Sequence, residues 1–92
     1  MKVANMRSSR GNKIANQFEI SDDFNNVYFQ SYNSIIAKRT YVDGAKKVYL
    51  DVNRWDYSRT TGKYRNIFLN ETKKETEKKI KKGEYILTDL NK

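Results

Sequence analysis

The sequence contains no cysteine and no histidine among its 92 residues. The absence of cysteine excludes disulfide bonds, zinc sites built from thiolates, redox pairs and thiol nucleophiles. The absence of histidine removes the commonest metal ligand and the usual general base of hydrolytic enzymes. We therefore expect a protein that is not an enzyme and that has no catalytic residues, no metal site and no cofactor.

Long hydrophobic runs are also missing, because no segment approaches the roughly 20 apolar residues that a membrane-spanning helix needs. The first residues, MKVANMRSSRGNK, are basic but contain no apolar core, so we do not expect them to form a secretory signal. A chain of this length forms one domain. We expect a cytoplasmic protein that does not contact a membrane.

The charge is strongly unbalanced, with 19 basic and 11 acidic residues and a net charge of +8. A small basic domain indicates a nucleic acid, an anionic membrane surface or an acidic protein as its partner. Lysine accompanies many Asn, Ile and Tyr residues, all encoded by A+T-rich codons, so arginine is the more informative cation. Arg54, Arg59 and Arg65 cluster in one segment, and Arg7 and Arg10 lie near the N-terminus.

Residues 1–12 carry basic but no acidic side chains, and we expect them to form a flexible basic arm. Residues 13–92 are expected to form a single α+β domain. Its elements follow the order β-β-β-α-α-β, which predicts an antiparallel sheet of about four strands with two helices on one face.

Period-two alternation predicts strands over residues 14–20 and 46–52, and a short run predicts a last strand over residues 84–90. Residues 26–42 are rich in β-branched and aromatic side chains, so we expect one long extended segment. Its alternation is imperfect, and a bulge or bend near residues 31–34 accounts for this. Asp43-Gly44 is a hairpin turn signal.

Two helices are expected after the third strand. The stripe of Tyr64, Ile67 and Phe68 predicts a helix that ends near residue 70, with Thr60 or Thr61 as its N-cap. The sequence TKKE from Thr72 is a capping box, which predicts a second helix on the surface.

The segment WDYSRTTGKYR, residues 55–65, combines aromatic, cationic and hydroxyl side chains at the start of the first expected helix. Helix N-termini bind phosphate through unpaired amides, and aromatic rings stack on unpaired bases. The alternative is structural, with hydroxyls as caps, rings in the core and cations in solvent. The candidate residues for binding nucleic acid or another partner are Arg54, Trp55, Tyr57, Arg59, Lys63 and Arg65, together with Arg7, Arg10 and Lys13 of the basic arm and its end.

Four motifs in combination resemble a family of very small phage-encoded proteins of unknown function. They are NQF at 16–18, YFQSYNSIIA at 28–37, YSRTTGKYRNIFL at 57–69 and GEYILTDLN at 83–91. The resemblance implies a viral or mobile-element origin, expression in a bacterial cytoplasm and an accessory role. Small accessory phage proteins often disable host nucleoprotein machinery, including CRISPR effectors. The family assigns no catalytic residues.

We therefore expect a non-enzymatic binder of nucleic acid, either DNA or RNA, or of a host nucleoprotein complex, acting as an inhibitor of host defence. One alternative is a histidine-free ribonuclease that uses the same cations, with Asp56 as the only clear general base in the segment. Another alternative is a structural phage protein that self-associates through the solvent face of its sheet, as in a homodimer.

Overall fold

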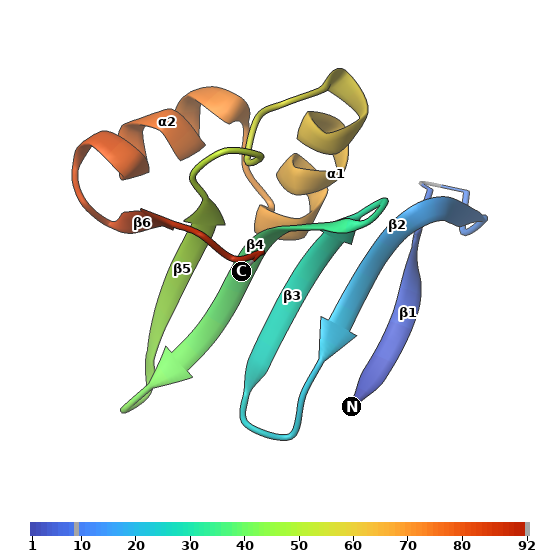
Figure 1. Ribbon diagram of the computed structural model, residues 1–92, viewed down its shortest axis with the longest axis horizontal. Coiled ribbons are helices and arrows are strands. Elements are labelled where there is room, and N and C mark those ends of the chain that lie inside the picture. Colours follow the sequence, from blue (N-terminus) through green and yellow to red (C-terminus); the bar gives the residue numbers. More distant parts are fainter. Residues whose placement is uncertain (9, 92) are drawn as a thin grey trace.

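A six-stranded sheet and two helices form one α+β domain in the computed structural model, which describes residues 1–8 and 10–91 (Figure 1). The strands are β1 (Lys2–Arg7), β2 (Lys13–Ser21), β3 (Asn26–Ser31), β4 (Ser34–Val42), β5 (Ala45–Asp51) and β6 (Tyr85–Thr88). The helices are α1 (Arg59–Leu69) and α2 (Lys73–Lys81). The strands lie in the sheet in chain order. The α+β class and the two helices were predicted correctly.

The prediction of about four antiparallel strands was wrong, because the sheet has six strands and is mixed. Strands β1 to β5 are antiparallel to their neighbours, whereas β6 is parallel to β5. The chain between β5 and β6 contains both helices, and a crossover of this length is what joins parallel strands.

The expected single extended segment over residues 26–42 is a hairpin of two strands. Ser31 of β3 pairs with Ser34 of β4, so the turn consists of Tyr32 and Asn33. Tyr32 has a φ of 55°, a conformation that is uncommon for a side chain of this size, so the sequence signal for a turn is weak. The turn lies where a bulge or bend was expected, near residues 31–34. A bulge is present as well, at Ile36, because Phe29 pairs with Ala37 and the next residue pairs with Ile35.

The turn at Asp43-Gly44 was predicted correctly. Val42 pairs with Ala45, and the two turn residues have φ values of 52° and 80°. Positive φ at both central residues matches the right-handed twist of the flanking strands.

Strand β1 lies within residues 1–12, the segment expected from the sequence to be a flexible arm. It pairs with the edge of β2, with Val3 opposite Ile20 and Ala4 opposite Glu19. Met6 is its one buried apolar side chain, so the hydrophobic signal for this strand is small. Ser9, which belongs to the same segment, and Lys92 lie outside the described residues.

The core lies between the sheet and helix α1. Phe29 of β3 and Leu50 of β5 are fully buried, and Phe29 stacks on Phe68 of α1 with ring centroids 5.8 Å apart. Tyr64 and Leu69 are the other buried apolar side chains of α1, whereas Ile67, which was predicted to belong to the core stripe, is 51% exposed.

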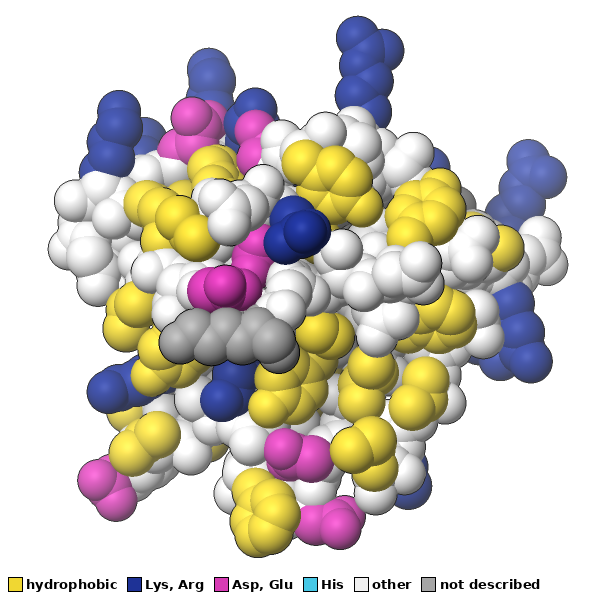
Figure 2. All heavy atoms as spheres, viewed as in Figure 1, with side chains coloured by type: hydrophobic (Ala, Val, Ile, Leu, Met, Phe, Trp, Pro, Cys, Tyr) yellow, Lys and Arg dark blue, Asp and Glu magenta, His cyan; other side chains and the backbone are white. Residues whose placement is uncertain are grey.

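Hydrophobic side chains also remain on the surface, where Figure 2 shows them spread across the strands of the sheet. Phe24 in the loop between β2 and β3 is 79% exposed, and Val3 of β1 is 60% exposed. The two helices pack near one end of the central strands and therefore leave much of the sheet uncovered (Figure 1).

The helix starts are set by hydroxyl caps. Ser58 is the N-cap of α1, where its Oγ accepts a hydrogen bond of 3.1 Å from the amide of Thr61, so the predicted cap at Thr60 or Thr61 was wrong. Thr61 is instead buried, with its hydroxyl 3.0 Å from that of Ser31. The capping box of α2 is present as predicted, formed by Thr72 and Glu75.

A buried carboxylate ties the helices to the last strand. Glu71, between α1 and α2, accepts hydrogen bonds of 2.7 Å from both Lys79 of α2 and the hydroxyl of Tyr85 in β6. Thr76 donates to the other oxygen of the same carboxylate. These contacts fix α2 and β6 relative to the end of α1.

Candidate functional site

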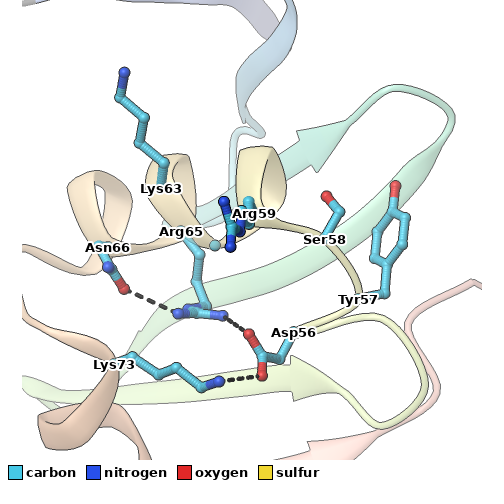
Figure 3. Close-up of a pocket in the computed structure, with 9 residues that line it drawn as sticks. Asp56, Tyr57, Ser58, Arg59, Lys63, Arg65, Asn66 and Lys73 are labelled. Atoms are coloured by element: carbon cyan, nitrogen blue, oxygen red, sulfur yellow. Dashed lines mark hydrogen bonds and ion pairs between the residues drawn. The ribbon is translucent and has the colours of Figure 1, made fainter.

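A shallow pocket of about 470 Å³ lies at the N-terminus of α1. Figure 3 shows that its walls come from the segment before α1, from the first two turns of α1 and from the start of α2. The lining residues are Asp56, Tyr57, Ser58, Arg59, Gly62, Lys63, Arg65, Asn66 and Lys73.

The segment before α1 is held by Asp51, the last residue of β5. The backbone carbonyl of Asp51 accepts hydrogen bonds from the amides of Arg54 at 3.3 Å and Trp55 at 3.0 Å. Its buried carboxylate accepts a further one from the amide of Asn53 at 3.2 Å. These bonds form a tight turn at the end of β5, so the chain enters α1 in a fixed direction.

Arg65 forms the floor of the pocket and is only 1% exposed. Its Nη1 donates to the carbonyl of Trp55 at 2.7 Å and to the carboxylate of Asp56 at 3.1 Å, and its Nη2 donates to Asn66 at 3.0 Å. The guanidinium carbon also lies 5.2 Å from the centre of the Trp55 ring. Arg65 is therefore a structural cation that holds the segment before α1 against the helix.

Gly62 lies against the guanidinium of Arg65. A side-chain Cβ at Gly62 would lie 3.6 Å from Nη2 of Arg65, which is ordinary contact distance. Larger side chains at this position would meet the guanidinium. Within the described residues, Nε of Arg65 is buried without a hydrogen-bond partner.

Asp56 joins the two helices because its carboxylate forms ion pairs with Arg65 of α1 and with Lys73 of α2. One carboxylate oxygen lies 3.1 Å from Nη1 of Arg65, and the other lies 2.7 Å from Nζ of Lys73 (Figure 3). Partial burial on its own raises the pKa of Asp56, but the hydrogen bonds from Lys73 and Arg65 outweigh it and hold the pKa below its usual value. The pairing raises the pKa of Lys73 in turn.

The cations Arg59 and Lys63 make no ion pair with a carboxylate among the described residues, although Nζ of Lys63 lies 5.5 Å from the ring centre of Tyr64. Both side chains are exposed, and in Figure 3 the side chain of Lys63 points away from the ion pairs that join Asp56, Arg65 and Lys73. Helix geometry also leaves the amides of the first turn without acceptors inside the helix, which gives this end a partial positive charge. Tyr57, which is 49% exposed, adds an aromatic ring at the rim. This arrangement suits an anion.

The pocket brings together four of the predicted residues, namely Tyr57, Arg59, Lys63 and Arg65. Trp55 does not line it, because its ring packs on Arg65 and against the core. Arg54 points to the carboxylate of Asp51, with the charged atoms 3.8 Å apart.

The remaining predicted residues lie on the β1–β2 hairpin. Arg7 pairs with Lys13 across the two strands, and its Nη1 donates to the carbonyl of Gly11 at 2.8 Å. Arg10 lies in the turn between them and is exposed. None of these three residues lines the pocket at α1.

Sequence reasoning missed Lys73 and Asn66 as pocket residues and treated Asp56 only as a possible base. Lys73 begins α2 and is 17 positions from Asp56, with a full helix between them. Lys73 and Asp56 come together only because of the path that the chain takes between the two helices. No local sequence pattern predicts this contact. From local patterns alone, the segment after Thr72 was therefore predicted only to be a helix on the surface.

Across residues 1–8 and 10–91, no group of three or more acidic side chains is arranged to hold a metal ion. Within the same residues, neither helix has the length and apolar character that crossing a membrane requires.

No curated protein and no solved structure matches the chain. A protein-family model matches residues 1–85, which is nearly the whole length. The chain therefore belongs to DUF8033, a family of unknown function.

Proposed function

We propose that this protein is a non-enzymatic binder of nucleic acid, either free or within a nucleoprotein complex of a bacterial host. The backbone phosphates would dock in the pocket at the N-terminus of α1. The observation that carries this proposal is the balance of charges there: four cations line the pocket, and its single carboxylate, Asp56, is already paired with two of them.

The contact is electrostatic. Arg59 and Lys63 are exposed and have no carboxylate within ion-pair distance among the described residues, so both side chains remain available to phosphate oxygens. Arg65 and Lys73 contribute charge from fixed positions. Lys and Arg contacts of this kind fix a nucleic-acid backbone without reading its sequence. We therefore propose binding that has little sequence specificity at this pocket.

The biological role that we propose is inhibition of a host defence system in the bacterial cytoplasm, such as a CRISPR effector. Two observations support this role: the small size and basic charge of the chain, and the resemblance of its motifs to phage-encoded proteins. A defence complex that holds a guide RNA presents phosphates to a basic protein in the same way as free nucleic acid does.

The ribonuclease alternative has less support. A general base must accept a proton near neutral pH. Asp56 is the only carboxylate in the pocket, and its pairing with Lys73 and Arg65 lowers its pKa, which makes it a weak base. We therefore propose binding without cleavage.

A binding titration in salt tests the proposal. The full chain is titrated into fluorescein-labelled 20-nucleotide DNA and RNA, single-stranded and duplex, and the anisotropy is followed at several salt concentrations. We expect the logarithm of the affinity to fall linearly with the logarithm of the salt concentration, by about 0.7–0.9 for each phosphate neutralised. The same labelled probes, analysed on a denaturing gel, should remain intact.

A pull-down from bacterial lysate, with and without nuclease, separates the two forms of the proposal. Capture that nuclease abolishes indicates nucleic acid, and capture of a defence complex that survives nuclease indicates recognition of the assembled machine. The proposal fails if the probes do not bind at low salt and the pull-down recovers no nucleic acid and no nucleoprotein.

A further inference from the structure

The sheet carries a continuous row of side chains on the face opposite the helices. One residue of each strand belongs to it, and each is the register partner of the next. In strand order the row consists of Val3, Ile20, Tyr28, Lys38, Tyr49 and Ile86. We call it the cross-strand row.

The row faces away from the core because side chains alternate along a strand. Phe29 and Leu50, which neighbour Tyr28 and Tyr49 in the chain, are fully buried on the helix side. Tyr28, Lys38 and Tyr49 are partly exposed, and Val3 and Ile86 at the ends of the row are 60% and 43% exposed. Figure 2 shows hydrophobic side chains across the strands with Lys or Arg side chains among them.

A cation occupies the centre of this row between two aromatic rings. Nζ of Lys38 lies 5.7 Å from the ring centre of Tyr28 and 5.6 Å from that of Tyr49. The two tyrosines stand on β3 and β5 with β4 between them, so they are two strand spacings apart, about 10 Å. Across the centre of the face, an aromatic ring on β3 is therefore followed by a cation on β4 and by a second aromatic ring on β5.

This charge pattern argues against a second copy as the partner. Two copies of this face brought together would bury Lys38 against an apolar surface, and a buried charge without a partner is costly. Asp22 lies near Lys38, but its oxygens already accept hydrogen bonds from the amides of Phe24 and Asn26 and from the side chain of Asn26. A partner with flat π surfaces and an anion between them fits the pattern.

We infer that this face binds single-stranded nucleic acid, with bases stacked on Tyr28 and Tyr49 and a phosphate near Lys38. Aromatic side chains on an open sheet are a recurring platform for unpaired bases, whereas bases inside a duplex do not present their faces. The inference rests on the proposed binding of nucleic acid and deepens it, because it adds a second surface and selects the single-stranded form.

The test compares two variants that change the same positions. The first replaces both rings by methyl groups (Tyr28→Ala with Tyr49→Ala), and the second removes only the hydroxyls (Tyr28→Phe with Tyr49→Phe). Each variant is first checked by circular dichroism and by its urea unfolding midpoint. The probes are fluorescein-labelled dT20 and a 20-base-pair duplex, both read by anisotropy.

We expect the alanine pair to bind dT20 about tenfold more weakly or worse, because base–aromatic stacking on this scale contributes to affinity at each ring. Its affinity for the duplex should stay unchanged, and the phenylalanine pair should bind both probes like the natural chain. If the alanine pair does not fold, Lys38→Glu serves instead and should weaken dT20 binding selectively.

Three results overturn the inference. The first is that the natural chain binds dT20 and that the alanine pair, or Lys38→Glu, binds it with unchanged affinity. This result would overturn binding at the cross-strand row but not the proposed binding at α1. The second is that light scattering shows the natural chain to be a dimer and the alanine pair to be a monomer. In that case a second copy of the chain occupies the face. The third is that the natural chain binds neither probe, which removes the proposed function together with the inference.

Discussion

The carboxylate of Asp51 and the side-chain amide of Asn91 lie 3.0 Å apart although 40 residues separate them in the chain. The amide of Leu90 donates to the same carboxylate at 2.9 Å. Asn91 also accepts a hydrogen bond from the amide of Ile35 at 2.7 Å and donates to its carbonyl at 2.9 Å. The last residues thus continue the pairing along β4 where β5 has ended.

Asn91→Ala should lower the free energy of unfolding by about 1–3 kcal/mol, because it leaves the backbone groups of Ile35 and one oxygen of Asp51 without these partners. Urea denaturation followed by circular dichroism measures this loss. Glu84→Gln, a change at an exposed side chain, is the control and should stay within about 0.5 kcal/mol of the natural chain. Equal stability of the two variants would show that the C-terminal contacts do not hold the fold.

Replacement of Arg65 should destabilise the domain, whereas replacement of Arg59 should not. Arg65→Met leaves the carbonyl of Trp55 and one oxygen of Asp56 without a donor, so we expect a loss of about 2–4 kcal/mol. Arg59→Gln changes an exposed side chain and should cost no more than about 0.5 kcal/mol. The single tryptophan, Trp55, contacts Arg65 and provides the fluorescence signal for both unfolding curves. A stable Arg65→Met variant would contradict the structural role of this arginine.

Ser58, and not Thr60, should be the hydroxyl that supports the start of α1. Ser58→Ala removes the acceptor of the Thr61 amide and should cost about 1 kcal/mol, the typical contribution of an N-cap. Thr60→Ala removes an exposed hydroxyl and should change stability by less than about 0.5 kcal/mol. Thermal unfolding of the two variants side by side decides between them, and the reverse order of stability would place the cap elsewhere.

Stability should depend on pH at both ends of the scale through Glu71 and Tyr85. Burial and the hydrogen bond to Glu71 raise the pKa of Tyr85 to about 12, so its contribution is complete below pH 10 and is lost as the pH rises through about 12. Burial of Glu71 raises its pKa, but the hydrogen bonds from Lys79, Thr76 and Tyr85 outweigh this and lower it overall. The contribution of Glu71 is therefore present at neutral pH and is lost as the pH falls through the lowered value.

Ultraviolet titration of the tyrosines provides the measurement. The ionisation of Tyr85 should appear as a late step near pH 12, and this late step should disappear in Tyr85→Phe. The same variant should lose the fall in stability above pH 10 that we expect for the natural chain. A late step that persists in Tyr85→Phe would assign the raised pKa to another tyrosine.

Local patterns in the sequence predicted the elements whose causes are local. The capping box at Thr72 and the turn at Asp43-Gly44 are short-range motifs, and both were confirmed because a few neighbouring residues suffice to form them. An irregularity near residues 31–34 was predicted, but not that it is a hairpin turn between two strands. The bulky Tyr32 has a positive φ there and is held by its surroundings, where its amide donates to the carbonyl of Asn16 on β2. Strand β1 was missed because its pairing comes from the edge of β2 and not from its own apolar residues.

The candidate site was predicted in part for the same reason. Arg59 and Lys63 could be placed at a helix N-terminus from spacing alone. The burial of Arg65, by contrast, depends on the Trp55 carbonyl and on Asp56, and the position of Asp56 is set in turn by Lys73 of the next helix. Such contacts arise only when the chain has folded, so the sequence could not separate the structural arginine from the exposed one.

The central claim is that exposed cations at the start of α1 bind nucleic-acid phosphates, and a matched pair of double variants tests it most directly. Arg59→Gln with Lys63→Gln removes two charges from the pocket, and Lys74→Gln with Lys78→Gln removes two exposed charges from α2 outside the pocket. The measurement is the affinity for a fluorescein-labelled 20-base-pair duplex at several salt concentrations. We predict that the pocket variant binds about tenfold more weakly and that its salt slope is smaller by about 2, because each lost phosphate contact lowers the slope by nearly one. Equal affinity and equal salt slope in the two double variants would contradict the account.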